Sequence, residues 1–383
     1  MGMRRFSVVL RAGLVGLLSA LSLGAAVAAA EVAVTDQAGR RVALAQPAQR
    51  VVLTDTSDFI ALALIDDRPA QRLVAWNRWR LDADTLAALR AADPAFDDIL
   101  QLSVDDPNNF PLERVIALQP DLVVLHPRFN AAERLIRQLE AAGVAVAVLR
   151  LTPSLRAADS LDGLRRLGVL IGRGEQAEAY AAFFQARLER IRSRAATVQR
   201  RPSVLLEPHA GSAACCSSVG SGENIGDLVS AAGGRHIGEG VLPGMFGQLS
   251  LEYVLEQAPE VYIGVGGAHL AERGGLVLGV STTPAAAQAS LGRVLARKGM
   301  SGIRAVEDGR AHGIWFPLTG GLSIVALEAV AKWVLPELYA DIDPQATLDE
   351  INARFLATPL RGTFWTNAPA RPGGFPAPSR STR

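Results

Sequence analysis

Apolar runs of strand length alternate with helical stretches in the first half of the chain. The strand-like runs are Arg50–Thr54, Arg72–Trp76, Asp121–Leu125 and Val144–Leu149. The helical stretches between them are Phe59–Leu64, Leu81–Ala91, Leu112–Leu118 and Ala131–Ala142. Because the strands are apolar throughout, they suit a parallel sheet that is covered by helices on both faces. Residues 32–47 predict a short strand, a turn and a second strand in front of this sheet.

The pattern changes in the middle of the chain, where residues 154–198 contain no strand-like run. This stretch predicts two helices, at 157–172 and 174–198. The second helix has apolar residues at helical spacing, namely Ala177, Tyr180, Ala181, Phe184, Leu188 and Ile191. A helix of about 25 residues is nearly 40 Å long, which is enough to act as a strut between two domains.

Strand–helix alternation resumes after Pro202. The strand-like runs are Ser203–Glu207, Glu260–Val265 and Ala311–Trp315, and the helical stretches are Ile225–Ala232, Leu251–Gln257, Leu291–Ala296, Leu322–Leu338 and Pro344–Phe355. The predicted fold is therefore α/β, with two lobes that each have a mainly parallel sheet flanked by helices, joined by one long rigid helix. The predicted parts are an N-terminal lobe (31–156), linking helices (157–199), a C-terminal lobe (200–340), a C-terminal helix and tail (341–368) and a disordered end (369–383).

Two segments 139 residues apart match in residue type and spacing. Each has Leu-Glu-x-Val-aliphatic, then a proline followed by an acidic residue, then an apolar run; the first begins at Leu112 and the second at Leu251. A glutamate in the first helical turn favours the positive end of the helix dipole, and the later proline ends the helix. The repeat predicts two lobes of related architecture, with Glu113 and Glu252 on the outer surface of each.

The N-terminus predicts secretion. Arg4 and Arg5 precede an almost wholly apolar stretch that ends in Ala28-Ala29-Ala30, so residues 1–30 are interpreted as a signal peptide; a retained membrane anchor is the alternative. The net charge is +1 and no basic stripe with interleaved aromatic residues occurs, which argues against a nucleic-acid partner.

Two adjacent cysteines, Cys215 and Cys216, are the complete cysteine content. Secretion permits oxidation, so a vicinal disulfide and a pair of free thiols both stay open. The five histidines show no metal-binding spacing, and no nucleophile-elbow motif occurs. An enzyme is therefore not expected, although a metal-dependent enzyme stays among the alternatives. No cofactor and no bound metal of the protein's own are expected.

Several segments together resemble the periplasmic binding proteins of iron–siderophore, haem and cobalamin ABC importers. They are 34–40 (VTDQAGR), Pro47 through Val52, 112–124 (LERVIALQPDLVV), 220–234 (GSGENIGDLVSAAGG) and 249–263. The order and spacing of these segments, which extend over nearly all of residues 32–365, make the resemblance fairly specific.

The resemblance implies a monomeric periplasmic protein that binds its cargo in a cleft between two lobes. It implies that Glu113 and Glu252 dock on basic pockets of an ABC importer permease in the inner membrane. The expected cargo is a small-molecule iron chelate, a ferric siderophore, with haem or cobalamin as the alternative. A periplasmic ligand sensor that serves no importer is a further alternative.

Ligands of open α/β sheets bind at loops beyond the carboxyl ends of the strands, and these loops carry unusual side chains here. The Trp76–Arg80 cluster supplies stacking surface and cationic donors, which suit a ferric complex with anionic oxygen donors. The candidate ligand-binding residues are Trp76, Arg78, Trp79, Arg80, His126, Arg128, Phe129, His209, Trp315 and Phe316. Either His126 or His209 could serve as an axial ligand if the cargo is haem.

Overall fold

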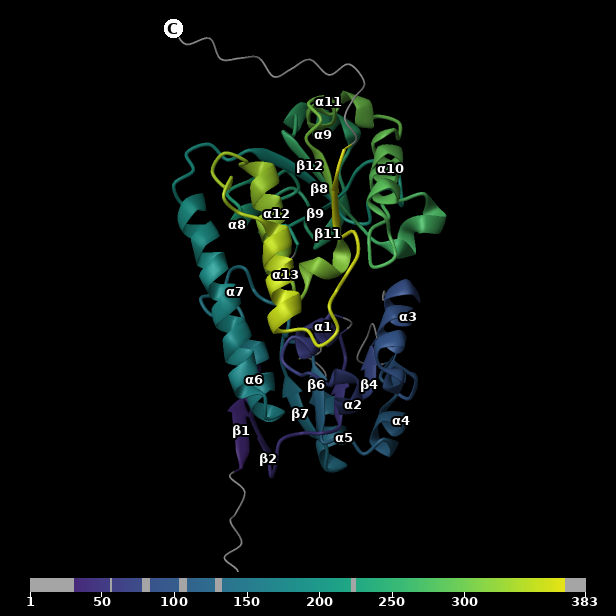
Figure 1. Cartoon of the computed structure of the whole chain (residues 1–383), viewed down its shortest axis with the longest axis vertical. Helices are drawn as coiled ribbons and strands as arrows, with labels where there is room; N and C mark the ends of the chain where they lie inside the picture. The colour runs from purple at the N-terminus through teal and green to yellow at the C-terminus, as the bar shows by residue number, and fades with distance from the viewer. Residues whose placement is uncertain are drawn as a thin grey trace, which may run out of the picture.

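The computed structural model describes residues 31–55, 57–77, 83–102, 109–127, 133–221 and 225–368. Two lobes lie one above the other, each built around its own five-stranded sheet (Figure 1). The α/β fold with two mainly parallel sheets flanked by helices, predicted from the sequence, is confirmed.

The N-terminal lobe contains a wholly parallel sheet in the order β5-β4-β3-β6-β7. Its strands are β3 (Val51–Leu53), β4 (Leu73–Asn77), β5 (Leu100–Leu102), β6 (Leu122–Leu125) and β7 (Ala145–Val148). Its helices are α1 (Asp58–Ala63), α2 (Pro69–Arg72), α3 (Ala83–Ala92), α4 (Leu112–Ala117) and α5 (Glu133–Ala141). The predicted strand–turn–strand at the start is the antiparallel pair β1 (Val32–Thr35) and β2 (Arg41–Leu44).

The C-terminal lobe contains a sheet in the order β10-β8-β12-β13-β14, in which β14 alone runs antiparallel. Its strands are β8 (Ser203–Glu207), β10 (Arg235–His236), β12 (Val261–Gly266), β13 (Ala311–Trp315) and β14 (Trp365–Asn367). A separate antiparallel pair is formed by β9 (Ser217–Val219) and β11 (Phe246–Gln248). The helices are α8 (Asp227–Ala231), α9 (Leu251–Gln257), α10 (Pro284–Leu295), α11 (Arg304–Glu307), α12 (Ser323–Val334) and α13 (Pro344–Arg354).

Two helices connect the lobes, α6 (Asp162–Leu170) and the longer α7 (Gly174–Ala195). α6 begins later than the predicted residue 157 because side chains form local turns there. The Ser154 hydroxyl accepts hydrogen bonds from the N–H groups of Arg156 and Ala157, and Asp159 accepts one from Leu161. α7 has 22 residues and is about 33 Å long, and it runs along one side of the molecule (Figure 1).

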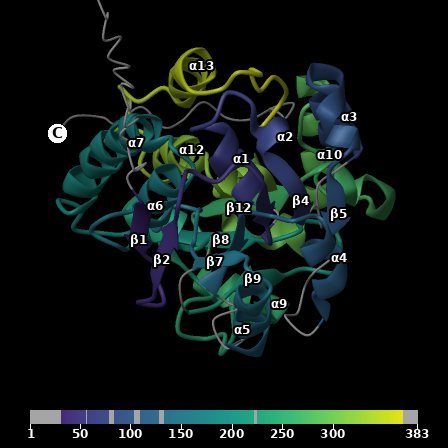
Figure 2. The ribbon, with the colours of Figure 1, turned by 90° about the horizontal axis from the view of Figure 1, so that it is seen from below.

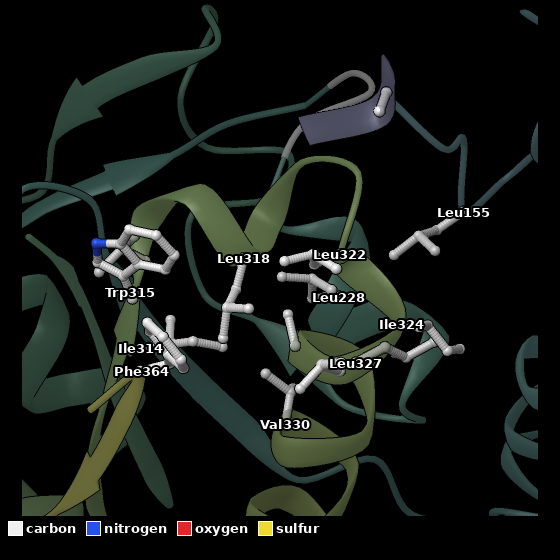
Figure 3. Packing of buried hydrophobic residues seen from close by; sticks show 14 of the residues in the cluster. Leu155, Leu228, Ile314, Trp315, Leu318, Leu322, Ile324, Leu327, Val330 and Phe364 are labelled. Carbon is white, nitrogen blue, oxygen red and sulfur yellow. The ribbon is translucent and has the colours of Figure 1, made fainter. Parts of the chain in front are cut away.

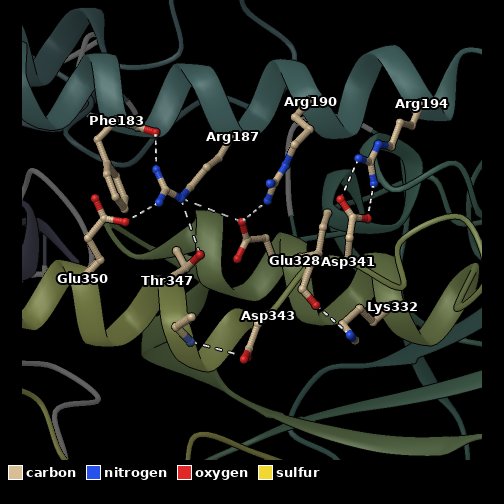
Figure 4. A network of polar contacts seen from close by, with 12 residues as sticks. Phe183, Arg187, Arg190, Arg194, Glu328, Lys332, Asp341, Asp343, Thr347 and Glu350 are labelled. Atoms are coloured by element: carbon tan, nitrogen blue, oxygen red, sulfur yellow. Dashed lines mark hydrogen bonds and ion pairs between the residues drawn. The ribbon is translucent and has the colours of Figure 1, made fainter.

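Salt bridges fasten the polar side of α7 to the C-terminal lobe (Figure 4). Arg187 donates a 2.5 Å hydrogen bond to Glu350 on α13, and Arg190 lies 3.4 Å from the carboxylate of Glu328 on α12. Arg194 binds both carboxylate oxygens of Asp341, at 2.5 and 2.8 Å. Because bidentate arginine–carboxylate pairs hold both groups in fixed orientation, this row of contacts fixes α7 against the helices beside it.

A continuous hydrophobic core joins the two lobes. One cluster of buried side chains includes Leu53 of the first sheet, Phe184 of α7 and Val265 of the second sheet. In the C-terminal lobe, α12 and the turn before it contribute Leu318, Leu322 and Leu327 to this core (Figure 3). Tyr180 of α7 is buried and donates a 2.6 Å hydrogen bond to the carbonyl of Gly321, next to α12. The lobes are therefore joined by side-chain packing as well as by the linking helices.

The carboxyl ends of the two sheets face each other where the lobes touch. A methyl group on Gly320, which follows β13, would lie 3.5 Å from Cβ of Ser57 and 3.8 Å from Cγ2 of Thr152. Ser57 follows β3 and Thr152 follows β7, so loops from strand ends of both lobes meet here. This is the arrangement in which α/β sheets bind ligands.

Candidate functional site

Three aromatic side chains meet at the carboxyl ends of neighbouring strands in the C-terminal lobe. They are His209 after β8, His269 after β12 and Phe316 after β13. Nε2 of His269 lies 3.4 Å from Nδ1 of His209. The rings of His209 and Phe316 stack with centroids 6.2 Å apart. Because His269 is exposed while the other two are half-buried, the group offers two imidazoles and a phenyl face to a ligand.

His209 has a backbone conformation that is rare for a residue other than glycine. Its φ is 51°, in the left-handed region, which is sterically costly for a residue with a Cβ. Hydrogen bonds on both sides hold it there, from Ala210 N–H to the carbonyl of Val265 (2.9 Å) and from Ser212 N–H to the carbonyl of His209 (3.0 Å). Strained residues of this kind cluster at binding sites, so the backbone supports a functional role for His209.

A buried ion pair anchors the loop that carries His209. Both carboxylate oxygens of Glu207 accept hydrogen bonds from Arg297, at 2.9 and 2.6 Å, and the hydroxyl of Tyr262 donates a further one of 2.6 Å. Arg297 also donates to the carbonyl of Ala213 in the same loop (2.8 Å). Burial raises the pKa of Tyr262 well above its usual range, so the phenol keeps its proton and remains a donor.

Burial works against the charge of Arg297, but the hydrogen bond and the charge of Glu207 raise the pKa of its guanidinium. Arg297 therefore keeps its positive charge over the physiological pH range, and its hydrogen bonds to Glu207 and Ala213 hold the loop between β8 and β9 in position.

On the side of the N-terminal lobe, a small polar network fixes three strand ends. The Thr54 hydroxyl donates to the carbonyl of Val124 (2.9 Å) and accepts from the N–H of His126 (3.3 Å). The amide of Asn77 donates to the carbonyl of Thr54 (3.0 Å). These contacts join the ends of β3, β4 and β6 and place the half-buried His126 at the edge of the sheet that faces the other lobe.

A polar pocket of about 360 Å³ lies beside these strand ends. Its lining includes Gln37, Pro127, Arg150, Thr152, Ser154 and Ser160. Pro127 follows β6 and Arg150 follows β7, so the pocket continues the same edge of the sheet. An apolar cavity of about 310 Å³ lies elsewhere, between α1, α3 and residues 356–360. Because its lining comes from helices and connecting loops and not from the carboxyl ends of the strands, we place the candidate ligand site at the strand ends instead.

The predicted docking acids occupy equivalent places in the two lobes. Glu113 lies in the first turn of α4 and Glu252 in the first turn of α9, and both are exposed. Val115 and Val254, two residues further on, are each completely buried. Within the described ranges, neither glutamate side chain takes part in a hydrogen bond or an ion pair. The two carboxylates are therefore presented to the solvent in the same way.

The acidic residue after each proline of the repeat also has the same function in both lobes. Asp121 accepts hydrogen bonds from the N–H groups of Gln49 and Arg50, at 2.8 and 2.9 Å, just before β3. Glu260 accepts one of 3.2 Å from the N–H of Ser203, at the start of β8. Each acid thus ties the end of the repeat to the neighbouring strand, so the sequence repeat corresponds to a structural repeat.

Residues 51–312 match the sequence model of a protein family that is described as "periplasmic binding protein". The chain belongs to the periplasmic binding protein family. No curated protein matches the chain significantly. This binding protein is similar to the TroA-like periplasmic binding protein FepB from Veillonella parvula, with a TM-score of 0.79 and 24% identity over 88% of this chain and 100% of that one.

More distant solved structures share the fold of the binding protein. A periplasmic heme binding protein from Pseudomonas aeruginosa has a TM-score of 0.52 and 21% identity, over 85% of this chain and 100% of that chain. The molybdate-bound MolA from Haemophilus influenzae has a TM-score of 0.59 and 19% identity, over 84% of this chain and 97% of that chain. Because the family consists of binding proteins, the expectation that the chain is not an enzyme is confirmed.

Two predicted ligand contacts lie in the core of the binding protein. Trp76 is 2% exposed and packs against Phe59 and Phe96, with ring centroids 5.0 and 5.8 Å away. Trp315 is 1% exposed and packs against Phe364. The prediction that these tryptophans contact ligand is corrected. Each is part of a strand, β4 or β13, whose side chains are covered by other elements, so neither indole offers a face to a ligand.

Other predictions fall on parts of the binding protein outside the described residues. These are the signal peptide 1–30, the end 369–383, and the candidate ligand residues Arg78, Trp79, Arg80, Arg128 and Phe129. None of the helices in the described ranges is long and apolar enough to cross a membrane. In the same part of the chain, no three His, Cys, Asp or Glu side chains form a group that could hold a metal ion.

Sequence reasoning missed His269 and Arg150. A signal for His269 was available, because it follows the apolar run that ends at Gly266 just as His209 follows the run that ends at Glu207. Arg150 follows the run that ends at Val148 in the same way. The sequence alone does not show that the ring of His269 turns towards His209.

The structure joins Cys215 and Cys216 as a vicinal disulfide in the loop before β9. Cys216 is buried, and its carbonyl accepts a hydrogen bond from the N–H of Leu249 (2.9 Å). The pair thus belongs to the loop that starts at His209. Of the two states left open by the sequence, the structure has the disulfide.

Proposed function

We propose that this binding protein captures a ferric siderophore in the periplasm and delivers it to an ABC importer. The observation that carries the proposal is the meeting of His209, His269 and Phe316 at adjacent strand ends that face the other lobe. The iron of a ferric siderophore is already coordinated by its chelator. The protein therefore has to recognise the outside of the complex.

The side chains at the strand ends suit the outer surface of a ferric siderophore. Imidazole N–H groups donate hydrogen bonds to the anionic oxygens that surround ferric iron. The phenyl face of Phe316 packs against the apolar rim of the chelator. In the N-terminal lobe, the pocket that includes Arg150 and Thr152 supplies further donors. A site with an apolar wall and a few convergent polar groups is typical of small-molecule binding.

Haem or cobalamin is the second candidate cargo, and the exposed imidazole of His269 favours it. An exposed histidine at the end of a strand can act as the axial ligand of a tetrapyrrole metal. In this case one imidazole nitrogen would bind the metal, whereas a ferric siderophore would only accept hydrogen bonds from the ring.

Delivery to the permease depends on Glu113 and Glu252. Two exposed carboxylates, one on each lobe, match two basic pockets of a two-fold permease. Charge-assisted hydrogen bonds to arginine would fix the orientation of the binding protein on the permease.

Native mass spectrometry of the purified protein with ferric siderophores, haem and cobalamin tests the proposed cargo. We expect a one-to-one complex with a ferric siderophore, together with a broad visible charge-transfer band. A Soret band and a haem adduct would replace the first candidate with the second. Failure to bind every member of the panel would contradict both.

A further inference from the structure

Most of the large apolar side chains that are exposed in the described ranges belong to one short segment of the chain. Among the described residues, five large hydrophobic side chains are exposed, and four of them lie within residues 241–255. We call these four the apolar patch: Val241 (50% exposed), Met245 (55%), Phe246 (51%) and Leu255 (41%). Clusters of this kind on a protein that is otherwise well packed mark sites of interaction.

Strand pairing, a side-chain hydrogen bond and packing hold the segment that carries the apolar patch in the C-terminal lobe. Phe246 is paired with Val219 in the β9–β11 ladder. The hydroxyl of Tyr253 on α9 donates a 2.8 Å hydrogen bond to the carbonyl of Ile237. Leu242 is buried beneath Gly247, where a methyl group would lie only 2.8 Å from a Leu242 methyl carbon. Because Leu242 is buried against Gly247, the loop around it is held in place. The neighbouring side chain of Val241 is exposed on that loop.

Glu252 lies at the border of the apolar patch. Leu255 follows it by three residues on α9, so the two side chains share one face of the helix. Phe246 precedes Glu252 by six residues, which cannot span more than about 20 Å. Ser250, between them, caps α9 with a hydrogen bond from the N–H of Tyr253 (3.1 Å). The patch and the carboxylate therefore lie on consecutive segments of the C-terminal lobe, β11 with the loop before it and helix α9 (Figure 2 shows α9 from below).

The charges around the patch select the kind of partner. Residues 236–272 contain no lysine or arginine, while Glu239, Glu252 and Glu256 are exposed. The exposed Lys298 and Arg304 belong to the neighbouring segment around Gly302, beside Leu255. On the side that carries the glutamates, a complementary surface is therefore apolar in its centre and basic at its rim. Anionic lipid headgroups would be repelled by these acids. A second copy related by a two-fold axis would bring the same acids together, which is also unfavourable.

We propose that the apolar patch and Glu252 together form the contact of the C-terminal lobe with the importer permease, with Met245 and Phe246 as apolar anchors. This inference rests on the proposed function. Buried aromatic anchors carry much of the affinity of protein interfaces, whereas a charge at the rim mainly sets orientation and association rate. The glutamate then aligns the two proteins, and the patch holds them together.

Binding of the labelled full-length chain to right-side-out inner-membrane vesicles of the source bacterium tests the inference. We expect the double variant M245S/F246S to bind at least about tenfold more weakly than the unchanged protein. The matched control is Val169→Ser, because Val169 is 43% exposed on α6, outside the patch, and its replacement should leave binding unchanged. Protease treatment of the vesicles should abolish binding, and circular dichroism should show that both variants are folded.

Four outcomes would overturn the inference. One is equal vesicle binding by M245S/F246S and the unchanged protein. Another is equal binding to protein-free liposomes of phosphatidylglycerol and phosphatidylethanolamine, which would make the partner a lipid surface. A third is a dimer in sedimentation analysis that the double variant loses. The last is weaker binding of the ferric siderophore panel by the variant, which would assign the patch to the cargo site.

The same assay separates this inference from the proposed function. If E113Q/E252Q binds the vesicles as well as the unchanged protein, importer docking through the two glutamates is wrong. If E113Q/E252Q loses binding and M245S/F246S keeps it, docking stands and only the role of the apolar patch falls.

Discussion

Gln119 and Ala258 share a left-handed backbone conformation at equivalent positions of the two lobes, with φ of 48° and 42°. Each directly precedes the proline that ends its copy of the repeat. A left-handed conformation is costly for a residue with a Cβ, yet both lobes retain it. The repeat therefore includes the shape of the turn as well as the residue types. In each lobe the turn directs the chain from the helix, α4 or α9, into the strand that follows, β6 or β12.

The turn at Ala258 should become more stable when its Cβ is removed. We expect Ala258→Gly to raise the free energy of unfolding by about 1 kcal/mol, because glycine adopts the left-handed conformation without steric cost. Urea denaturation measures the change. Ala296 provides the control, since it ends α10 in the right-handed region; Ala296→Gly should lower stability by roughly 0.5–1 kcal/mol. A loss of stability in both variants would contradict the explanation.

The contribution of Glu328 to the free energy of unfolding should decrease as the pH rises. Burial raises its pKa, although Thr347 and Arg190 act in the opposite direction. The folded protein thus holds a proton at pH values where the unfolded chain has released it. Its contribution is present below the ordinary pKa of glutamate, about 4.3, and is lost as the pH rises through the higher pKa of the folded state. The stability of Glu328→Gln relative to the unchanged protein should therefore increase from pH 4 to pH 7.

Glu350 provides the control, because its contribution to the free energy of unfolding should change with pH in the opposite direction. The hydrogen bond from Arg354 lowers its pKa, so its contribution is present above the ordinary pKa and is lost on acidification. The stability of Glu350→Gln relative to the unchanged protein should fall over the same range. Thermal melts at each pH would refute the assignment if both variants followed the same trend.

Neutralising both of the proposed docking acids should stop transport without affecting capture. We expect E113Q/E252Q to bind cargo like the unchanged protein, because both side chains are exposed and lie on helices rather than at the carboxyl ends of the strands. Uptake of the radiolabelled iron chelate in cells should fall to background. Undiminished uptake would favour a ligand sensor over an importer subunit.

Replacing His209 should weaken cargo binding. We expect His209→Ala to lose about tenfold or more in affinity, since one charge-assisted hydrogen bond contributes roughly 1.5–3 kcal/mol. Fluorescence quenching titration with the ferric siderophore measures the loss. His312→Ala is the control, because His312 stacks on Trp333 and bonds to Asn367, near the opposite end of β13. Equal losses in both variants would show a general effect on folding.

Cargo binding should move the lobes very little. The packing of α7 and the continuous core resist bending, unlike a hinge of flexible strands. Small-angle scattering should show a change of less than about 0.5 Å in a radius of gyration near 20 Å. A large decrease on binding would refute the rigid connection.

The sequence predicts the main elements because their apolar patterns are strong. β6 is recognisable since all four residues Leu122–Leu125 are apolar, and the structure buries all four completely. Short strands such as β5, β9, β11 and β14 carry no such pattern. Each has three residues, and each includes at least one polar residue. They form because a neighbouring strand offers hydrogen bonds, and this information lies elsewhere in the chain.

The candidate site was predicted less well because it depends on side-chain direction. Trp76 and Trp315 lie at strand ends, as the sequence indicates, but a residue at the end of a strand can turn inward or towards the loops, and both turn inward. His209 and Phe316 lie where the pattern places them. The left-handed backbone of His209 and its contact with His269 depend on the loop between β8 and β9, whose path is set by Glu207 and Arg297.

The antiparallel strand β14 has a consequence for how the protein behaves at high protein concentration. Without it, β13 would be the outer strand of the second sheet, with a row of unpaired N–H and C=O groups. Residues Trp365–Asn367 occupy that row, and the new outer strand is only three residues long. Because short edge strands are poor templates for other chains, this segment should protect the protein from edge-to-edge aggregation.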